Sequence, residues 1–478
     1  MQRSKDEHCK CGAKSNRMSL RDRALFCAEH LRKSVIATVC GFLQAFNANT
    51  RKGGVWVSVK IIDAPMGFGK TSAMINFMNA ASTSSRFVFV TPYLDEGTRI
   101  RTSCPKLDFQ IPESEQIDES GKFKSKMIDF KDFLKKGQNI VTTHALFERF
   151  DIETLQMIIN GRYTLIMDEV ADVASKFDIS PYDAKNLNAQ HIEHDFTGQL
   201  TWRDTDREYY GRFLDYKHVC ETGCLWYYND SSIIKMIPIN TFSAFEDVYI
   251  MTYMFDAQWH RCYFDLFGIP YEYMYVDGNE PGNYYITNIP KTYSMPWLQE
   301  KIHIYDGNLN VIGHDWNTLS SSRYERSEKS DLEEIKKSVY NFLYNKNHAS
   351  SSQVLWTCFK EKQKPWDKEP KERKPYFTPR SYASSFLSCN ARATNAYRDR
   401  TVVAYPINRF MPPEVKNFFL KRDIKIEEEK WALSEMIQWI WRSAIRDKRD
   451  IWIYIPSRRM RTLLEQWIAE VSMLQPAA

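Results

Sequence analysis

A glycine-rich stretch at residues 64–71 contains the residue types that bind nucleotide phosphates. Its two glycines allow backbone N–H groups to converge on phosphate oxygens, and a helix that follows would present its positive N-terminal end to them. Lys70 would reach the β- and γ-phosphates, and the Thr71 hydroxyl would ligate Mg²⁺. The pattern predicts an ATP-binding phosphate loop in which Ala64 replaces the first glycine of the strict pattern. The residues of this loop are Ala64, Pro65, Met66, Gly67, Phe68, Gly69, Lys70 and Thr71.

A pair of carboxylates about a hundred residues later could complete such a site. Asp168 and Glu169 follow the apolar stretch 163–167. A buried parallel strand of this kind delivers the residues behind it to the carboxyl edge of its sheet, where ligands bind in open α/β sheets. Asp168 would hold Mg²⁺ through water, and Glu169 would polarise the attacking water. An ordinary surface Asp-Glu pair is the alternative, and the presence of a phosphate loop argues against it.

The surrounding sequence predicts the elements that position these groups. Residues 55–63 alternate and then run apolar, as a buried strand does, and residues 72–79 have helical spacing. Two further strands are predicted at 86–90 and 139–141, each followed by polar residues. These polar residues are Thr91, Pro92, Thr142, Thr143 and His144.

Together the motifs resemble those of superfamily 2 helicases and translocases of the DExH type, over roughly residues 55–460. The resemblance implies an α/β fold with two tandem RecA-like P-loop NTPase domains, and it implies ATP and Mg²⁺ as cofactors. Ala171 departs from the family pattern because His or Asp is usual at its position. In the family, hydroxyls and main-chain amides behind the two further strands contact the nucleic-acid backbone without reading its sequence. The residues at those positions are Thr91, Pro92, Thr142, Thr143 and His144.

Two other motifs of the family have looser counterparts in this chain. Thr252, which follows a predicted strand at 247–251, stands where the family couples hydrolysis to strand movement. Thr394 and Asn395 resemble a motif in which small and hydroxyl residues lie against both strand and nucleotide. The resemblance therefore implies a coupling role for Thr252 and nucleic-acid contacts for Thr394 and Asn395.

The last motif of the family resembles residues 438–446. Gln438, Arg442 and Arg446 have the spacing i, i+4, i+8, which predicts one shared face of a single helix. Trp441 takes the place of a usual glycine, and the last arginine falls one residue late. The resemblance implies that these three residues act in catalysis and that Arg442 or Arg446 is an arginine finger.

Turn-forming segments in the sequence indicate where the domains divide. A turn-rich segment begins at Gly278, and a second α/β pattern begins near residue 301. We expect an N-terminal extension at 1–50, a first RecA-like domain at 51–280, a linker at 281–300 and a second RecA-like domain at 301–478.

Four potential metal ligands lie in the N-terminal extension. Cys9, Cys11, Cys27 and His30 form the pattern Cys-x-Cys-x15-Cys-x2-His, which is of the size that a tetrahedral zinc knuckle needs. Four unrelated residues on a basic arm are the equal alternative. Either version could help to grip nucleic acid or a protein partner.

Composition excludes several classes of protein. With 43% hydrophobic and 26% charged residues the chain has the make-up of a folded soluble protein. No apolar run reaches the roughly 18 residues of a membrane span, and the N-terminus lacks the apolar core of a signal peptide. Its ten cysteines are then expected to be reduced thiols in the cytoplasm, which would be that of the host if the protein is viral. A net charge of only +5 does not by itself identify a nucleic-acid binder.

The function that these motifs predict is an ATP-dependent helicase or translocase. The resemblance to replication helicases of phages and large DNA viruses favours DNA as the substrate and replication proteins as further partners, with RNA left open. One alternative is a packaging or terminase-type motor, which would need clustered nuclease carboxylates near the C-terminus. Another is a non-catalytic adaptor that binds ATP as a switch, and the intact Asp168-Glu169 pair argues against it.

Overall fold

The computed structural model describes residues 58–92, 94–113, 125–203, 209–280, 282–361, 374–391 and 396–474. Among them, Asn186–Tyr227 form one compact unit and the rest form a second, larger unit. The predicted N-terminal extension and part of one predicted nucleic-acid motif fall outside the described residues. The predicted site residues that lie outside them are Cys9, Cys11, Cys27, His30, Thr394 and Asn395.

The larger unit contains a seven-stranded sheet in the order β12-β11-β1-β10-β4-β2-β3. Every neighbouring pair from β11 to β3 is parallel, and only β12 runs antiparallel to its neighbour. Because the strands are parallel, their carboxyl ends meet at one edge of the sheet. The strands are β1 (Val59–Asp63), β2 (Arg86–Thr91), β3 (Ile140–Thr143), β4 (Tyr163–Asp168), β10 (Asp247–Thr252), β11 (Tyr271–Asp277) and β12 (Tyr285–Thr287).

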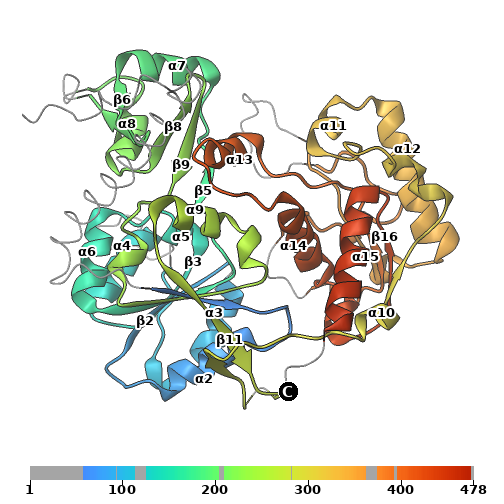
Figure 1. Cartoon of the computed structure of the whole chain (residues 1–478), viewed down its shortest axis with the longest axis horizontal. Coiled ribbons are helices and arrows are strands. Elements are labelled where there is room, and N and C mark those ends of the chain that lie inside the picture. Colours follow the sequence, from blue (N-terminus) through green and yellow to red (C-terminus); the bar gives the residue numbers. More distant parts are fainter. Residues whose placement is uncertain are drawn as a thin grey trace, which may run out of the picture. The chain divides into compact units, whose positions relative to one another are not determined.

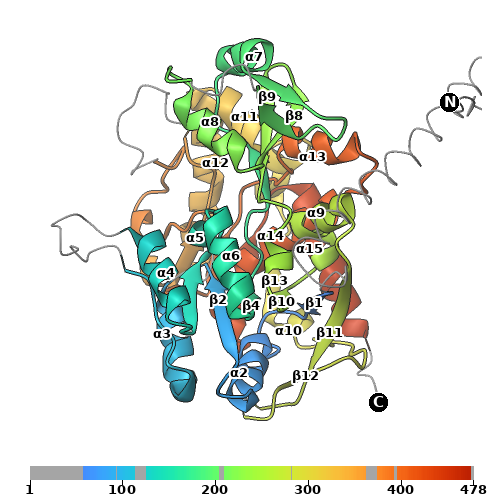
Figure 2. The ribbon, with the colours of Figure 1, turned by 90° about the vertical axis from the view of Figure 1, so that its left-hand side faces the viewer.

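Helices connect these strands, as parallel neighbours require. Two of them begin at side-chain caps: Ser125 accepts a hydrogen bond from Ile128 N at 3.4 Å, and Asp151 accepts one from Thr154 N at 2.8 Å. The helices that follow these caps, α4 and α6, pack against each other (Figure 2). The helices are α2 (Lys70–Ala80), α3 (Leu94–Ser103), α4 (Lys126–Lys135), α5 (His144–Phe147), α6 (Ile152–Gly161) and α9 (Trp259–Phe267).

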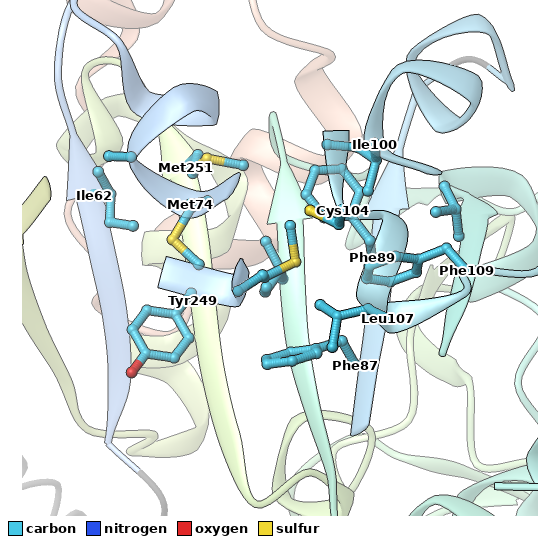
Figure 3. Close-up of a cluster of buried hydrophobic side chains, with 14 of the residues drawn as sticks. Ile62, Met74, Phe87, Phe89, Ile100, Cys104, Leu107, Phe109, Tyr249 and Met251 are labelled. Atoms are coloured by element: carbon cyan, nitrogen blue, oxygen red, sulfur yellow. The ribbon is translucent and has the colours of Figure 1, made fainter. Parts of the chain in front are cut away.

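A hydrophobic core anchors α2 and α3 to this sheet (Figure 3). Ile62 of β1, Phe89 of β2 and Met251 of β10 are fully buried in it, together with Met74 of α2 and Ile100 of α3. Each side chain of this size stabilises the folded state by about 1.5–3 kcal/mol when buried. The core therefore holds the start of α2, and with it the glycine-rich loop, firmly against β1.

A second parallel sheet in the larger unit has the order β13-β16-β15-β14. Two helices of the same half, α14 and α15, lie side by side (Figure 1). The strands are β13 (Ile302–Ile304), β14 (Val354–Trp356), β15 (Val402–Ala404) and β16 (Ile451–Tyr454). The helices are α10 (Leu298–Lys301), α11 (Ser321–Arg326), α12 (Lys329–Tyr340), α13 (Pro413–Leu420), α14 (Glu428–Ile440) and α15 (Arg458–Met473).

Helix α15 is fixed by an amphipathic pattern and by a side-chain cap. Its buried residues recur at helical spacing and include Met460, Leu464, Trp467 and Val471. Ser457 precedes the helix and accepts a hydrogen bond from Met460 N at 3.4 Å. The amphipathic stripe and the cap together fix both the face and the start of α15.

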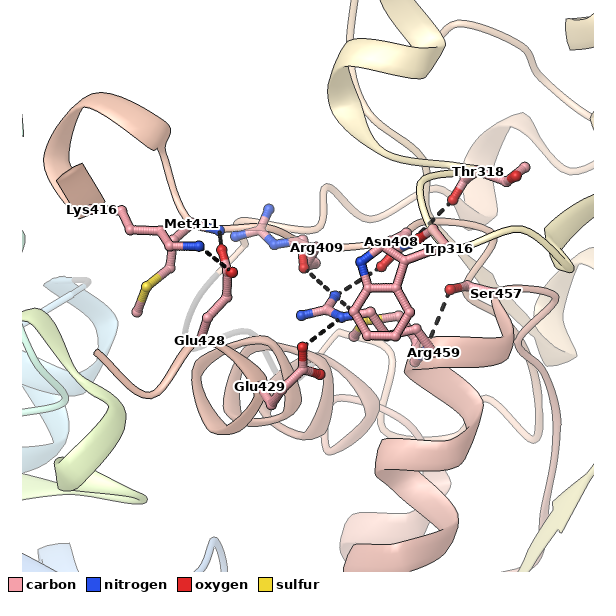
Figure 4. A network of polar contacts seen from close by, with 11 residues as sticks. Trp316, Thr318, Asn408, Arg409, Met411, Lys416, Glu428, Glu429, Ser457 and Arg459 are labelled. Carbon is pink, nitrogen blue, oxygen red and sulfur yellow. Dashed lines mark hydrogen bonds and ion pairs between the residues drawn. The ribbon is translucent and has the colours of Figure 1, made fainter. Parts of the chain in front are cut away.

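A buried arginine ties α15 to the loop before α13 (Figure 4). The side chain of Arg459 is only 2% exposed and donates to Glu429 Oε1 at 3.0 Å, Asn408 Oδ1 at 2.9 Å and the Arg409 carbonyl at 2.6 Å. Its guanidinium also lies 5.5 Å from the ring centroid of Trp316. This network fixes Arg409 and Trp316, which line a cavity described below.

An insertion separates β4 from β10 in the chain. Within the small unit, β6 and β7 form an antiparallel hairpin whose turn is closed by Asp195 Oδ1, which accepts from Thr197 N at 2.9 Å and from Gln199 N at 3.0 Å. In the larger unit, β5 and β9 pair antiparallel. The elements of the insertion are β5 (Ala174–Lys176), α7 (Pro181–Gln190), β6 (Ile192–His194), β7 (Leu200–Trp202), α8 (Leu214–Glu221), β8 (Leu225–Asn229) and β9 (Ser232–Met236).

The structure confirms a mixed α/β chain with parallel sheets. One difference lies in the segment 281–300 that was expected to be a linker, because β12 falls inside it and pairs with β11. In the part of the chain that the structure describes, no helix combines the length and the apolar character needed to cross a membrane.

Candidate nucleotide site

The carboxyl edge of the seven-stranded sheet brings together residues from five strands. Asp63, Thr91, Thr143, Asp168 and Thr252 are the last residues of β1, β2, β3, β4 and β10, respectively. Since β10 lies between β1 and β4, the glycine-rich loop and the acidic pair are separated by one strand. This edge is where open parallel sheets bind ligands.

The glycine-rich loop has the backbone conformation that its sequence predicts. Gly67 and Gly69 have φ of 85° and 78°, in the left-handed region that favours glycine. A Cβ atom at Gly69 would also lie 2.6 Å from the Tyr284 ring, so a larger residue would clash there. Helix α2 begins at the next residue, Lys70. The loop therefore passes from β1 to α2 through a backbone turn that depends on glycine at positions 67 and 69.

Lys70 is held by the loop itself. Its Nζ donates to the carbonyls of Ala64 and Pro65, the latter at 3.1 Å. Burial lowers the pKa of Lys70 to about 8, while Asp168, Asp63 and Glu169 act in the opposite direction. A bound polyphosphate would favour the charged amine, because it adds negative charge beside it. Lys70 is thus suited to bind an anion.

Asp168 is a buried carboxylate at the sheet edge with a raised pKa. Burial raises its pKa to about 7, with contributions from Glu169 and Glu96, and Lys70 opposes the shift. A buried carboxylate with like-charged neighbours is stabilised by a divalent cation, and Mg²⁺ prefers oxygen ligands such as this carboxylate and the Thr71 hydroxyl. The residues present therefore fit Mg²⁺ bound with a nucleotide. Among the described residues there is no group of three or more His, Cys, Asp or Glu side chains that could hold a metal ion without such a partner.

An arginine from the second sheet's half lies against the acidic pair. Arg442 Nη2 is 3.3 Å from Glu169 Oε1, and Arg442 is only 9% exposed. The Nε atom of Arg442 is buried without a hydrogen-bond partner, so the guanidinium has donor capacity to spare. Glu169 itself has φ of 58°, a conformation that non-glycine residues seldom adopt. The predicted catalytic glutamate and a predicted finger arginine are thus brought together.

The expectation of a single helix carrying Gln438, Arg442 and Arg446 is wrong. Helix α14 ends at Ile440, and Ser443 is extended with ψ of −173° while its hydroxyl donates to the Ile440 carbonyl at 2.6 Å. A serine hydroxyl that satisfies a terminal carbonyl competes with continuation of the helix. The three residues therefore do not share one helix face.

The three residues separate into different surroundings as a result. Gln438 lies on α14 and lines a cavity, Arg442 lies just past the helix, and Arg446 lies on a 3-10 helix, η11 (Ala444–Asp447). The pKa of Arg446 is lowered by partial desolvation and by the charges of Arg442 and Arg398. Arg446 is therefore near Arg442, and Arg442 is the arginine whose guanidinium lies 3.3 Å from Glu169 Oε1.

The predicted nucleic-acid-binding residues that the structure describes are buried or half-buried. The side chains of Thr91 and Thr142 are at most 1% exposed, and Thr143 and Pro92 are half-buried. His144 is also buried, and its Nε2 lies 3.1 Å from the carbonyl of Asp168. In this structure His144 helps to position the acidic strand.

Asp63 is a site residue that sequence reasoning missed. Its carboxylate accepts hydrogen bonds from Met254 N at 2.9 Å and Phe255 N at 3.0 Å. Burial raises its pKa, and these bonds together with Lys70 oppose the shift. The available signal was an acidic residue at the end of a buried strand, directly before the glycine-rich loop. Asp63 connects that strand to the segment that follows β10.

A cavity of about 1540 Å³ opens beside the acidic box. Its lining begins at Val170, directly after Glu169, and includes the exposed indole of Trp316, which is 60% exposed. Arg409 also lines it and is paired with Glu435 at 2.8 Å. None of the loop residues 64–71 belongs to the lining, so the cavity is a separate space from the glycine-rich loop.

Comparison with known proteins gives matches to one family. The family model of the YonV C-terminal Rossmann-like domain matches residues 296–468, and that of the YonV middle domain matches residues 174–235. The SPbeta prophage-derived uncharacterized protein YonV of Bacillus subtilis (strain 168) is 38% identical over 419 residues, which are 86% of this chain and 98% of the relative. The first match covers the second parallel sheet, and the second covers most of the insertion.

Solved structures offer only distant likenesses. The structure of S. tokodaii Xpd4 has a TM-score of 0.40 and 10% identity, and the match covers 91% of this chain and 98% of that one. The DUF1998 helicase MrfA bound to DNA and AMPPNP has a TM-score of 0.33 and 11% identity, with 91% of this chain and 50% of that one covered. Both scores are too low for the likeness to carry an argument about function.

Proposed function

This chain belongs to the YonV family, and we propose that it is an ATP hydrolase that moves along nucleic acid. The observation that carries the proposal is the meeting of Arg442 with Glu169, directly beside the sheet edge that holds Lys70 and Asp168. Phosphoryl transfer in P-loop enzymes uses a phosphate loop, an acidic pair and an arginine that approaches from a second α/β part. In such enzymes the two parts close on the bound nucleotide.

The residues divide the work of hydrolysis. Backbone N–H groups of the loop and Lys70 hold the β- and γ-phosphates. Mg²⁺, bound with the nucleotide at Thr71 and Asp168, would neutralise charge on the phosphate oxygens. Glu169 orients and polarises the attacking water, and Arg442 supplies its guanidinium to the charge that spreads over the γ-phosphate. Arg fits this role because its planar fork donates two directed hydrogen bonds.

Lys70 and Arg442 both have protein partners at present, namely carbonyl oxygens of the loop and Glu169. ATP would replace these acceptors with phosphate oxygens, and Glu169 would then be released from Arg442 to act on water. This exchange would make the Glu169 carboxylate available to act on water only when nucleotide is bound.

The cavity supports nucleic acid as the partner. Bases of a single strand stack on aromatic side chains, and the exposed Trp316 at the cavity is braced from behind by the Arg459 guanidinium. Arg323 and Arg326 of the short helix α11 also line the cavity, and both are exposed. They could contact phosphates, whereas Arg409 is already paired with Glu435.

The finer assignments belong to the same proposal. Two RecA-like domains, at 51–280 and 301–478, would provide the two parts that close on the nucleotide, and the resemblance to DExH-type replication helicases of phages and large DNA viruses favours DNA. Thr252 would couple hydrolysis to movement, and Cys9, Cys11, Cys27 and His30 would hold Zn²⁺.

Hydrolysis measured with single-stranded DNA, duplex DNA and RNA tests the proposal. Wild-type protein is expected to turn over ATP faster with at least one of them, and Lys70→Ala is expected to lose tight ATP binding. ATP binding without turnover under all conditions would favour the ATP-switched adaptor instead. Stimulation by duplex DNA together with nuclease activity would favour the packaging motor.

A further inference from the structure

We propose that Tyr253 and the segment behind it position Arg442 for catalysis, so that the path from nucleotide to the second sheet runs through Tyr253 and two tryptophans. The segment follows β10 and includes the 3-10 helix η6 (Phe255–Ala257). This inference rests on the proposed hydrolysis and adds a positioning residue that the motifs do not indicate.

The segment is fixed at one end to the phosphate-loop strand. The Asp63 carboxylate accepts from Met254 N and Phe255 N, at 2.9 and 3.0 Å, and Met254 has φ of 56°. Ala64, the first residue of the loop, donates its N–H to the Thr252 carbonyl at 3.1 Å. The segment is therefore bonded both to the end of β1, through Asp63, and to the start of the loop, through Ala64.

At its other end the segment is fixed to α15. Trp467 Nε1 donates to the Tyr253 hydroxyl at 2.8 Å, and the two ring centroids are 6.5 Å apart. The Trp467 ring in turn packs edge-on against Trp441, with centroids 5.9 Å apart. Trp441 is 4% exposed and directly precedes Arg442. The hydroxyl of Tyr253 is thus separated from the arginine backbone by two packed rings.

A second bond fixes the same segment to α14. Gln258 is 3% exposed, and its Nε2 donates to Ser434 Oγ at 3.1 Å and to the Tyr253 carbonyl at 3.3 Å. Ser434 lies two turns before the end of α14, the helix that delivers Arg442. Helices α14 and α15 are both bonded to the short segment 252–258. The position of Arg442 relative to Lys70 therefore depends on how this segment is placed.

Positioning of this kind affects turnover more than binding. A displacement of a catalytic group by about 1 Å can cost on the order of a hundredfold in rate. Tyr253→Phe removes the acceptor for Trp467 and keeps the ring, so we expect kcat to fall by about tenfold or more while ATP affinity changes by less than about threefold. Trp467→Phe is expected to have the same effect, and the double variant should be no worse than either one.

Tyr263→Phe is the matched control. It also removes a buried tyrosine hydroxyl, which donates to the Ile237 carbonyl at 3.2 Å, and the ring of Tyr263 packs against Phe242, Phe264 and Phe267. Its loss of thermal stability should resemble that of Tyr253→Phe, while its kcat stays near that of the wild type. A fall in kcat in both variants would show general destabilisation and would overturn the inference.

The Arg442→Ala background provides a readout that a purely structural role would not change. If Tyr253 acts through Arg442, Tyr253→Phe should lower kcat no further in that background. Equal, additive losses in both backgrounds would overturn the inference, as would full activity of Tyr253→Phe. Absence of turnover in the wild type would instead remove the proposed function, and this inference with it.

Discussion

Asp168→Asn should make the nucleotide-free protein more stable and inactive. Its pKa of about 7 in the folded chain, against an ordinary value of 3.8, means that the folded state disfavours the charged carboxylate. A difference of about 3 in pKa corresponds to about 4 kcal/mol at about 1.4 kcal/mol for each factor of ten. Asparagine has nearly the same shape and carries no charge, so the variant avoids this penalty.

The direction of the pH dependence follows from linkage. The penalty is absent below the unfolded pKa, grows as the pH rises through the interval between the two pKa values, and is complete above about 7. We expect Asp168→Asn to exceed the wild type in free energy of unfolding by about 2–4 kcal/mol at pH 8 and by about 1–2 kcal/mol at pH 5. Urea unfolding followed by tryptophan fluorescence at pH 5, 6, 7 and 8 measures it.

Asp277→Asn gives a control of opposite sign. Lys291, together with Gly278 N and the Tyr285 hydroxyl, lowers the pKa of Asp277 to about 2. This carboxylate contributes stability above pH 3.8 that is lost as the pH falls toward 2, so its replacement should destabilise the protein at pH 8. An Asp168→Asn variant that is less stable than the wild type at pH 8 would refute the inference that burial destabilises the charged form of Asp168.

Three further outcomes are expected. Glu169→Gln should retain ATP binding, measured by a fluorescent analogue, yet stop turnover, because an amide cannot polarise water; turnover at the wild-type rate would show that the acidic pair is misassigned. Of Arg442→Lys and Arg446→Lys, the first should cut DNA-stimulated turnover by on the order of a hundredfold or more with DNA binding retained, and the second should act less; near-normal rates in both would remove the role of the second sheet. Freshly purified protein should contain about one equivalent of zinc that Cys9→Ser with Cys11→Ser releases, and metal analysis without zinc would end that idea.

Local patterns in the sequence were sufficient to predict the turn between β1 and α2 and the strand that ends at Asp168. The loop is recognised from Gly67, Gly69 and Lys70, which lie close together in the sequence. The apolar residues 163–167 predict the strand that leads to Asp168. These features depend on backbone conformation and on burial of a single strand, which short stretches of sequence determine.

Features that depend on packing between distant segments could not be predicted in the same way. Regular spacing suggested one helix through Arg446, but the Ser443 hydroxyl and the bond from Ala444 N to the Arg400 carbonyl, at 2.9 Å, end it early. Likewise, nothing near Tyr253 in the sequence indicates Trp467, which lies 214 residues away. Such contacts exist only once both sheets have formed.

Binding of ADP with aluminium fluoride, which mimics the transferring phosphoryl group, is the most direct measurement of whether Arg442 completes a site built on the other sheet. Wild type and Arg442→Ala should bind ATP with similar affinity, because Lys70 and Mg²⁺ dominate ground-state binding. The mimic should bind to Arg442→Ala at least about a hundredfold more weakly than to the wild type, since an arginine finger acts chiefly on the transition state. Equal affinity of the two proteins for the mimic would contradict a composite active site.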